Sequence, residues 1–217
     1  MRLMKLLIFD LDGTIADTKS SVCEAVNMAM EHFGKPSVTP EDVEHAMGNG
    51  AVMLIRRLLP EADRDNDEFV RTVYEYYDRM YDATCTNAHC YEGMKEAIAE
   101  LKGRGYKIAV LSNKQDRYTK KLVGKHFSDS VVDFTQGQTD LPKKPDPAVP
   151  LMIAERFGIS PGECAFIGDS DVDVLTAKNA GMVGVACAWG YRPESVLEAL
   201  SPEWLIHEPA ELCKIFG

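Results

Sequence analysis

Four short polar segments of the sequence carry side chains that could handle a phosphate group. These side chains are Asp10 and Asp12 in DLDGT, Ser112 and Asn113 in LSN, Lys144 in KPDP, and Asp169 and Asp173 in GDSDVD. Four carboxylates brought together would repel one another strongly, so a cation must lie among them. Oxygen ligands favour Mg²⁺ over softer metals. A hydroxyl group and a compact ammonium suit the oxygens of a phosphoryl group.

Taken singly, each segment has an ordinary structural interpretation. Asp-x-Asp-Gly at a strand end is often a turn, Ser-Asn commonly begins a helix, and a lone lysine is usually solvated. GDSDVD could equally begin a helix, because the helix dipole favours acids there. These interpretations do not explain why all four segments occur in order at the predicted ligand-binding edge of one sheet.

Short apolar runs with intervening helical stretches predict the sheet that positions these segments. The clear runs are Leu6–Phe9, Ile108–Leu111, Ala165–Gly168 and Val183–Ala186, and Val131–Phe134 is a weaker candidate. Continuous apolar runs suit strands that are covered on both faces. Helical stretches at Gly93–Gly103 and Asp171–Ala180 alternate with them. This alternation predicts a parallel sheet in an α/β domain.

The stretch from residue 17 to residue 87 has no strand-like run. Its apolar residues recur at helical spacing, in the sets Val22/Val26/Met30/Phe33, Val52/Ile55/Leu58 and Phe69/Val73/Tyr76/Met80. Thr39-Pro40 supplies a capping residue and a first-turn proline for a further short helix. We therefore expect an α/β core of residues 1–16 and 88–217, with an all-helical insert at residues 17–87.

Composition limits the classes of function that fit this chain of 217 residues. A formal net charge of −10 gives no general attraction to nucleic acid or to anionic lipid. The six cysteines form no CxxC pair and no Cys/His cluster, which argues against a zinc site and a disulfide framework. The apolar start is interrupted by charges and fits a buried strand better than a signal peptide. We expect a cytoplasmic monomer or homodimer with no nucleic-acid or membrane partner.

DLDGT, LSN, KPDP and GDSxxD closely resemble the four ordered motifs of the haloacid dehalogenase-like hydrolase superfamily. The resemblance spans nearly all of the chain. It implies a Rossmann-like parallel sheet with an inserted helical cap, and a magnesium-dependent phosphatase that forms an aspartyl-phosphate.

The same resemblance implies a role for each matching residue. Asp10 would be the nucleophile and Asp12 the general acid/base. Ser112, Asn113 and Lys144 would bind the transferring phosphoryl group. The implied Mg²⁺ ligands are Asp10, the backbone carbonyl of Asp12, and Asp169, with Asp173 supporting the metal directly or through water.

Departures from particular relatives favour hydrolysis of a phosphate ester. Dehalogenases lack the second aspartate, present here as Asp12, and phosphonate-cleaving relatives place a small residue there. The β-phosphoglucomutase pattern has a histidine where this chain has Val22. Two alternatives within the superfamily stay open, a pyrophosphatase and a sugar phosphomutase. A non-enzymatic receiver module is more remote, because that fold has no helical insert after its first strand.

The segment Gly48-Asn49-Gly50, together with Trp189-Gly190-Tyr191-Arg192, resembles phosphoglycolate phosphatases. The resemblance implies that this cap loop binds the carboxylate of a small phosphorylated metabolite, and 2-phosphoglycolate is the substrate that it favours. Arg56 or Arg57 could help, but adjacent helical residues point about 100° apart, so we expect at most one to face the site. From the residues alone, the two glycines indicate a turn that needs positive φ.

Overall fold

The computed structural model describes residues 4–217, which divide into two compact units. The first unit contains the described residues up to Asp17 together with Cys90–Gly217, and the second contains Thr18–His89. Short strands β2 (Ala16–Asp17) and β3 (His89–Cys90) pair where the chain passes between the units. The apolar start of the chain is therefore described only from Met4 onward.

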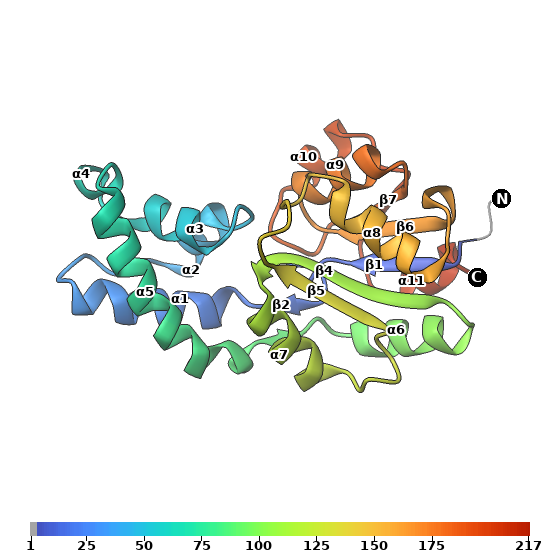
Figure 1. Cartoon of the computed structure of the whole chain (residues 1–217), viewed down its shortest axis with the longest axis horizontal. Helices are drawn as coiled ribbons and strands as arrows, with labels where there is room; N and C mark the ends of the chain where they lie inside the picture. Colours follow the sequence, from blue (N-terminus) through green and yellow to red (C-terminus); the bar gives the residue numbers. More distant parts are fainter. Residues whose placement is uncertain (1–3) are drawn as a thin grey trace. The chain divides into compact units, whose positions relative to one another are not determined.

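A six-stranded parallel sheet forms the centre of the first unit (Figure 1). The strands are β1 (Leu6–Phe9), β4 (Lys107–Gln115), β5 (Phe134–Gln138), β6 (Cys164–Gly168), β7 (Val183–Cys187) and β8 (Trp204–Ile206). Their order across the sheet is β5-β4-β1-β6-β7-β8. Strand β1 pairs with β4 on one side and with β6 on the other. The loop that follows β1 therefore starts between the ends of two neighbouring strands.

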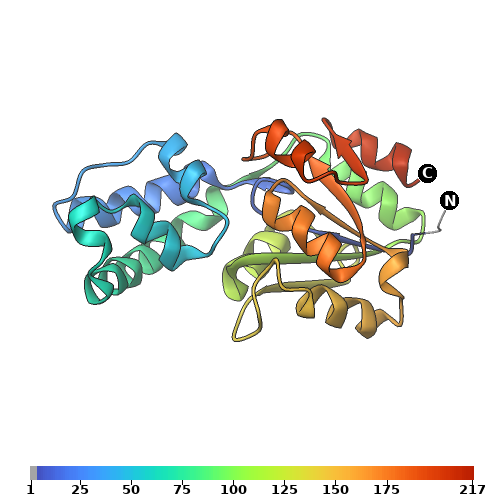
Figure 2. The same ribbon diagram turned by 90° about the horizontal axis from the view of Figure 1, so that it is seen from above.

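Helices cover both faces of this sheet. They are α6 (Met94–Gly103), α7 (Asp116–His126), α8 (Ala148–Phe157), α9 (Asp171–Ala180), α10 (Glu194–Ala199) and α11 (Ala210–Ile215), with the short turn η2 (Pro161–Glu163). Two views show α6, in light green, and α8, in gold, on opposite sides of the strands (Figure 1 and Figure 2). Ile8 and Phe166 pack with Ile153 of α8 in one buried cluster. Because both faces are covered, strands β1, β6 and β7 are apolar along their whole length.

The α/β fold is confirmed, and the four clear apolar runs lie in β1, β4, β6 and β7. The weaker candidate Val131–Phe134 is wrong, because β5 begins only at Phe134. Immediately before it, the Asp133 carboxylate accepts a hydrogen bond from the Ile108 N–H and pairs with Lys102. That carboxylate anchors a turn rather than a strand. The three-residue strand β8 was not predicted.

The second unit, called the helical unit below, contains five α-helices and one short 3₁₀ turn. They are α1 (Lys19–His32), α2 (Pro40–Ala46), α3 (Ala51–Leu58), α4 (Glu61–Arg64), α5 (Asp67–Thr84) and η1 (Cys85–Asn87). Thr39 caps α2 through a reciprocal pair of hydrogen bonds with Asp42, and Pro40 occupies the first turn. The predicted start of this helix is confirmed.

The predicted apolar face is right for α1, whereas α3 and α5 bury only Ile55 and Val73 of their predicted sets. Val22, Val26 and Met30 are buried as expected. In α3 the buried residues are Leu54 and Ile55, whereas Val52 is exposed.

Helix α5 buries the face that contains Val70, Val73, Tyr77 and Tyr81, one position on from most of the predicted set. Phe69 and Tyr76 stay half-buried because their rings pack against the rings of Phe33 and His32 near the unit's surface. Within residues 4–217, no helix is both long and apolar enough to cross a membrane.

Truncating the core side chain of Ile153 should destabilise the first unit. Ile153 is fully buried between α8 and the sheet, so Ile153→Ala should lower the free energy of unfolding by about 2–5 kcal/mol. Val196→Ala on α10 is the matched control, because Val196 is exposed and its loss should change stability by less than about 0.5 kcal/mol. Urea titration of both variants measures the difference. Equal effects would contradict this description of the core.

Candidate active site

Asp10 continues the line of β1 into the gap between β4 and β6. Phe9 pairs with Val110 of β4 and with Ile167 of β6, and the Asp10 N–H donates to the Ile167 carbonyl at 2.8 Å. The carboxyl ends of parallel strands meet at one edge of the sheet, where ligands bind in open α/β folds. The backbone pairing of β1 therefore fixes the backbone position of Asp10.

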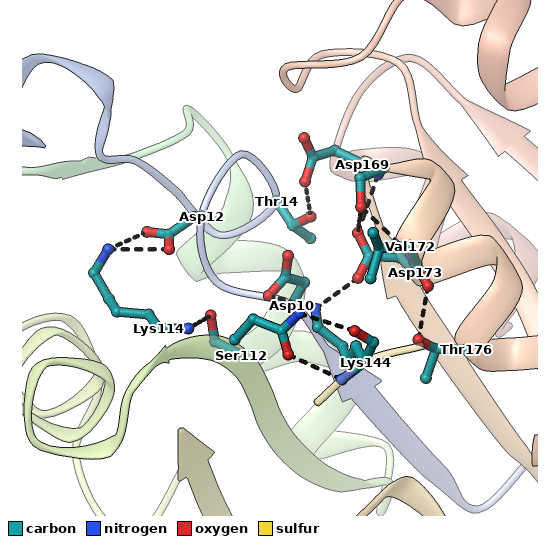
Figure 3. Close-up of polar contacts among 12 residues, drawn as sticks. Asp10, Asp12, Thr14, Ser112, Lys114, Lys144, Asp169, Val172, Asp173 and Thr176 are labelled. Atoms are coloured by element: carbon teal, nitrogen blue, oxygen red, sulfur yellow. Dashed lines mark hydrogen bonds and ion pairs between the residues drawn. The ribbon is translucent and has the colours of Figure 1, made fainter. Parts of the chain in front are cut away.

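Three buried carboxylates gather at this edge of the sheet (Figure 3). Asp10, Asp169 and Asp173 each offer one oxygen, and these oxygens lie within 4.8 Å of one another. Asp169 follows β6 directly, whereas Asp173 lies in the first turn of α9, where it forms a capping box with Ser170. Gly168 makes room for it, because a Cβ there would lie 2.3 Å from the Cβ of Asp173.

Lys144 places one ammonium among these carboxylates. Its Nζ lies 2.6 Å from Asp173 Oδ1 and 2.8 Å from Asp10 Oδ1, and the side chain is only 4% exposed. The Asn113 side chain fixes the backbone of Lys144. Asn113 Nδ2 donates to the Lys144 carbonyl at 3.1 Å, and Asn113 Oδ1 accepts from the Lys144 N–H at 2.9 Å. The structure therefore uses the Asn113 side chain to position Lys144. Its contact with phosphate stays a prediction.

Asp169 is held through both of its carboxylate oxygens. The Thr14 hydroxyl donates to Oδ1 at 2.9 Å, and the Tyr191 N–H donates to Oδ2 at 2.8 Å. A Cβ at Gly13 would lie 2.3 Å from the same carboxylate, and Gly13 also has a φ of +84°. Glycine is therefore needed at this turn for both space and backbone conformation.

Asp12 points to a second lysine rather than into the acidic cluster. Lys114 Nζ lies 2.8 Å and 3.0 Å from the two Asp12 oxygens, and the side chains of Asp12 and Lys114 are 16% and 8% exposed. Between Leu111 and Gln115 the pairing of β4 with β5 shifts register, which displaces Ser112–Lys114 from the regular ladder. Irregularities of this kind often redirect side chains next to functional sites. Ser112 itself is 3% exposed and accepts from the Lys114 N–H.

Charge and hydrogen bonding at the acidic cluster fit a divalent cation. One lysine faces three buried carboxylates, so an excess of negative charge stays uncompensated. Within the described residues, no hydrogen bond reaches the buried Asp10 Oδ1, although the Lys144 ammonium lies beside it as an ion pair. An all-oxygen donor set suits a hard cation such as Mg²⁺.

The pKa values express the same excess of negative charge. The pKa of Asp10 is raised to about 7, chiefly by burial. The Lys144 ammonium opposes this rise, and the Asp173 carboxylate adds to it. Burial also raises the pKa of Asp169 well above its ordinary value, with Asp173 and Asp10 adding to the effect. Burial lowers the pKa of Lys144, but the ion pairs with Asp10 and Asp173 outweigh burial, so its pKa is raised and the ammonium stays charged.

In the helical unit, the loop before α3 has its own internal bonding. Gly48 and Gly50 have φ values of +112° and +89°, so both glycines supply backbone that other residues rarely adopt. The Arg57 guanidinium donates to the Asn49 side chain at 2.7 Å and to the Ala46 carbonyl at 3.0 Å. Arg57 is therefore the arginine attached to this loop.

Arg56, the other arginine named from the sequence, forms its bonds elsewhere in the helical unit. Its guanidinium bonds to the Arg64 carbonyl and pairs with Asp67 at the start of α5. The pair joins α3 to α4 and α5. In this structure Arg56 therefore links helices of the helical unit, and its contact with substrate stays a prediction.

The structure brings five predicted residues of the first unit to one place: Asp10, Asp169, Asp173, Lys144 and Ser112 (Figure 3). Asp12 lies at the edge of this group, on Lys114. Sequence reasoning did not assign roles to Lys114, Thr14 or Tyr191. The positions of Lys114 directly after Ser112-Asn113 and of Thr14 in DLDGT were the available signals. Tyr191 acts through its backbone N–H, which no residue type reveals.

Comparison with known proteins places this geometry in a family. Residues 7–187 match the model described as haloacid dehalogenase-like hydrolase. The chain is 32% identical to a phosphoglycolate phosphatase of Vibrio vulnificus, over 98% of this chain and 96% of that protein. It is also 32% identical to a phosphoglycolate phosphatase of Mannheimia succiniciproducens, over 97% of each. A crystal structure of a predicted phosphoglycolate phosphatase from Haemophilus somnus superimposes with a TM-score of 0.92 at 27% identity and covers 100% of both chains.

The raised pKa of Asp10 predicts how stability depends on pH in EDTA. Between about pH 4 and 7 the folded protein keeps a proton on Asp10 that the unfolded chain has released. The free energy of unfolding should therefore fall as pH rises through this window, by at most about 1.4 kcal/mol per pH unit from this group. Excess Mg²⁺ should weaken the fall, because a bound cation stabilises the ionised carboxylates.

Urea unfolding at several pH values measures this slope. Asp10→Asn should make the slope shallower, and the raised pKa of Asp169 should maintain the remainder. Asp140→Asn, which removes an exposed carboxylate on the loop after β5, should leave the slope unchanged. An unchanged slope in Asp10→Asn would contradict the assignment.

Proposed function

The chain belongs to the haloacid dehalogenase-like hydrolases and is a phosphoric monoester hydrolase. We propose that it hydrolyses a small phosphate monoester, using Mg²⁺ and forming an aspartyl-phosphate on Asp10. The observation that carries the proposal is the placement of the Asp10 carboxylate. It is buried at the end of β1, beside the Lys144 ammonium and the carboxylates of Asp169 and Asp173. A carboxylate in this position can attack phosphorus in line.

Lys144 and Ser112 receive the transferring phosphoryl group in this proposal. The Lys144 ammonium already bridges Asp10 and Asp173, so a phosphoryl oxygen beside Asp10 would lie within reach of its N–H groups. The Ser112 hydroxyl offers a further donor at the adjacent strand end. Positive charge and hydrogen-bond donors stabilise the equatorial oxygens of the transition state.

Asp12 supplies proton transfer on the side of the leaving group. It stands two residues beyond Asp10, and Lys114 binds both of its carboxylate oxygens. We assign Asp12 the protonation of the departing alcohol and then the activation of the water that cleaves the acyl-phosphate. Lys114 limits the orientations that the Asp12 carboxylate can adopt.

Asp10, Asp169 and the backbone carbonyl of Asp12 would hold Mg²⁺, and Asp173 would support this set. When bound, the cation neutralises the acidic cluster and stabilises negative charge on the phosphoryl oxygens. Thr14 and the Tyr191 N–H keep Asp169 oriented for this purpose.

The proposed substrate is 2-phosphoglycolate, with the α/β core as the catalytic domain and the helical unit as its cap. The support is the similarity to the phosphoglycolate phosphatases of Vibrio vulnificus and Mannheimia succiniciproducens, which align over nearly their whole length. Within the helical unit, the loop at Gly48-Asn49-Gly50 and the attached Arg57 are the groups we assign to the substrate carboxylate.

A panel of phosphate esters tests the proposed substrate. With Mg²⁺, kcat/KM should be highest for 2-phosphoglycolate among a set that includes pyrophosphate, hexose phosphates and mononucleotides. EDTA should abolish the release of phosphate. Preference for another ester would discard the proposed substrate and leave the reaction class, whereas release that is independent of divalent cations would contradict the metal assignment.

Asp10→Asn tests the nucleophile. An amide is a far weaker nucleophile and removes a negative charge from the metal site, so kcat should fall by at least about 10³-fold. Asp140→Asn is again the matched control and should keep wild-type kcat, since its side chain is exposed on a loop outside the cluster. Single-turnover assays with 2-phosphoglycolate or p-nitrophenyl phosphate measure the difference. A variant with more than a few per cent of wild-type activity would remove Asp10 from this role.

A further inference from the structure

We infer that Trp189-Gly190-Tyr191, called the WGY segment, positions the carboxylate of Asp169 for metal binding. This inference rests on the proposed function, which makes Asp169 a metal ligand. Of this segment, only the Tyr191 N–H has been given a role so far, as a donor to Asp169. Its contacts give it a more specific role.

Trp189 and Asp169 bind the same residue from two sides. The indole N–H of Trp189 donates to the Thr14 carbonyl at 3.1 Å, and the Thr14 hydroxyl donates to Asp169 Oδ1 at 2.9 Å. Thr14 is fully buried and Asp169 is 1% exposed. The indole therefore fixes the backbone of the residue whose hydroxyl orients the carboxylate.

Gly190 lets the segment approach Asp169 closely. A Cβ at position 190 would lie 2.2 Å from the Asp169 Cβ, a distance that real Cβ contacts do not reach. The adjacent Tyr191 N–H then donates to Asp169 Oδ2 at 2.8 Å. A larger residue at position 190 would have to push this N–H, the Asp169 side chain, or both out of place.

The segment is itself anchored at both ends. The Ala188 N–H, just before it, donates to the Ile206 carbonyl of β8 at 2.9 Å. The Tyr191 hydroxyl donates to Oδ1 of Asp17, the last residue of β2, at 3.2 Å. These anchors reduce the freedom of the groups that touch Asp169, so the carboxylate is held in one orientation before a cation arrives.

Each Asp169 oxygen accepts one hydrogen bond from this arrangement and keeps a second lone pair for a cation. Groups that orient a metal ligand in this way commonly contribute 10- to 100-fold to metal affinity. A segment that only fills space beside β7 would contribute to stability and leave metal affinity unchanged.

Metal affinity measured by calorimetry tests the inference, with Mn²⁺ and Mg²⁺ as probes and no substrate present. Trp189→Phe removes the indole N–H and should weaken both cations by at least about tenfold. The chain has two tryptophans, and Trp204 on β8 is 47% exposed, so Trp204→Phe is the matched control and should bind both cations as wild type does. Wild-type affinity in Trp189→Phe would overturn the inference.

Two further variants separate the parts of the segment. Gly190→Ala should weaken both cations by at least about tenfold, because its Cβ displaces Asp169. Tyr191→Phe keeps the N–H on Asp169 and loses only the hydroxyl on Asp17, so its metal affinity should change by less than about threefold. Wild-type affinity in Gly190→Ala would count against the inference.

A fluorescence titration covers the case in which Trp189→Phe fails to fold. In Trp204→Phe the only remaining tryptophan is Trp189, and its emission should change on addition of Mn²⁺ or Mg²⁺. An unchanged emission at saturating cation would overturn the inference. Asp169→Asn tests the underlying assignment separately: full metal affinity in that variant would refute the proposed metal site itself, whatever Trp189→Phe shows.

Discussion

Three carboxylates are buried close together at the end of β1 and one ammonium pairs with two of them, and this arrangement of charge determines what the rest of the site must provide. Like charges at these distances in a poorly solvated place repel strongly, and one lysine cannot balance them. Burial and the neighbouring acids raise the pKa values of Asp10 and Asp169 for this reason. A divalent cation and a phosphoryl dianion are complementary partners for such a site, because the first relieves the acids and the second uses the lysine.

The fold builds this arrangement with few elements. Because β1 lies between β4 and β6, the residues after three strands converge without long loops. Glycines stand where the acids need room: Gly168 beside Asp173, and Gly13 and Gly190 beside Asp169. Side-chain amide bonds from Asn113 fix the backbone of Lys144, so the ammonium does not depend on its long flexible stem alone. The contacts around the cluster thus oppose the repulsion that would otherwise spread it.

The sequence predicted the α/β core because its signals are local. An apolar run with a polar segment at its end marks β1 and β6. In the helical unit, a capping residue with a following proline marks α2 in the same local way. Helix faces were harder, since in α3 and α5 several apolar or aromatic residues compete for one buried stripe. Tertiary packing buries Leu54 rather than Val52 and Tyr77 rather than Tyr76, and the spacing of apolar residues alone does not specify this choice.

At the site, the residue types in the sequence were enough to predict the acids, Lys144 and Ser112. They were not enough to predict groups whose role depends on which neighbours the fold gives them. The Tyr191 N–H is a backbone group, and Lys114 and Arg57 matter because of which side chains they meet. Asp133 shows the same limit in the fold: its carboxylate bonds to the Ile108 N–H in a turn, and the strand begins only after it, at Phe134.

The central claim is that Asp10 becomes covalently phosphorylated. The most direct measurement is mass spectrometry of peptides from Asp12→Asn after brief reaction with substrate and Mg²⁺ and an acid quench. Loss of the proposed base should slow cleavage of the acyl-phosphate, so the account predicts one added phosphoryl group, sensitive to hydroxylamine, on the peptide that contains Asp10. A phosphoryl group on another residue, or rapid product release with no modified peptide in both wild type and Asp12→Asn, would contradict it.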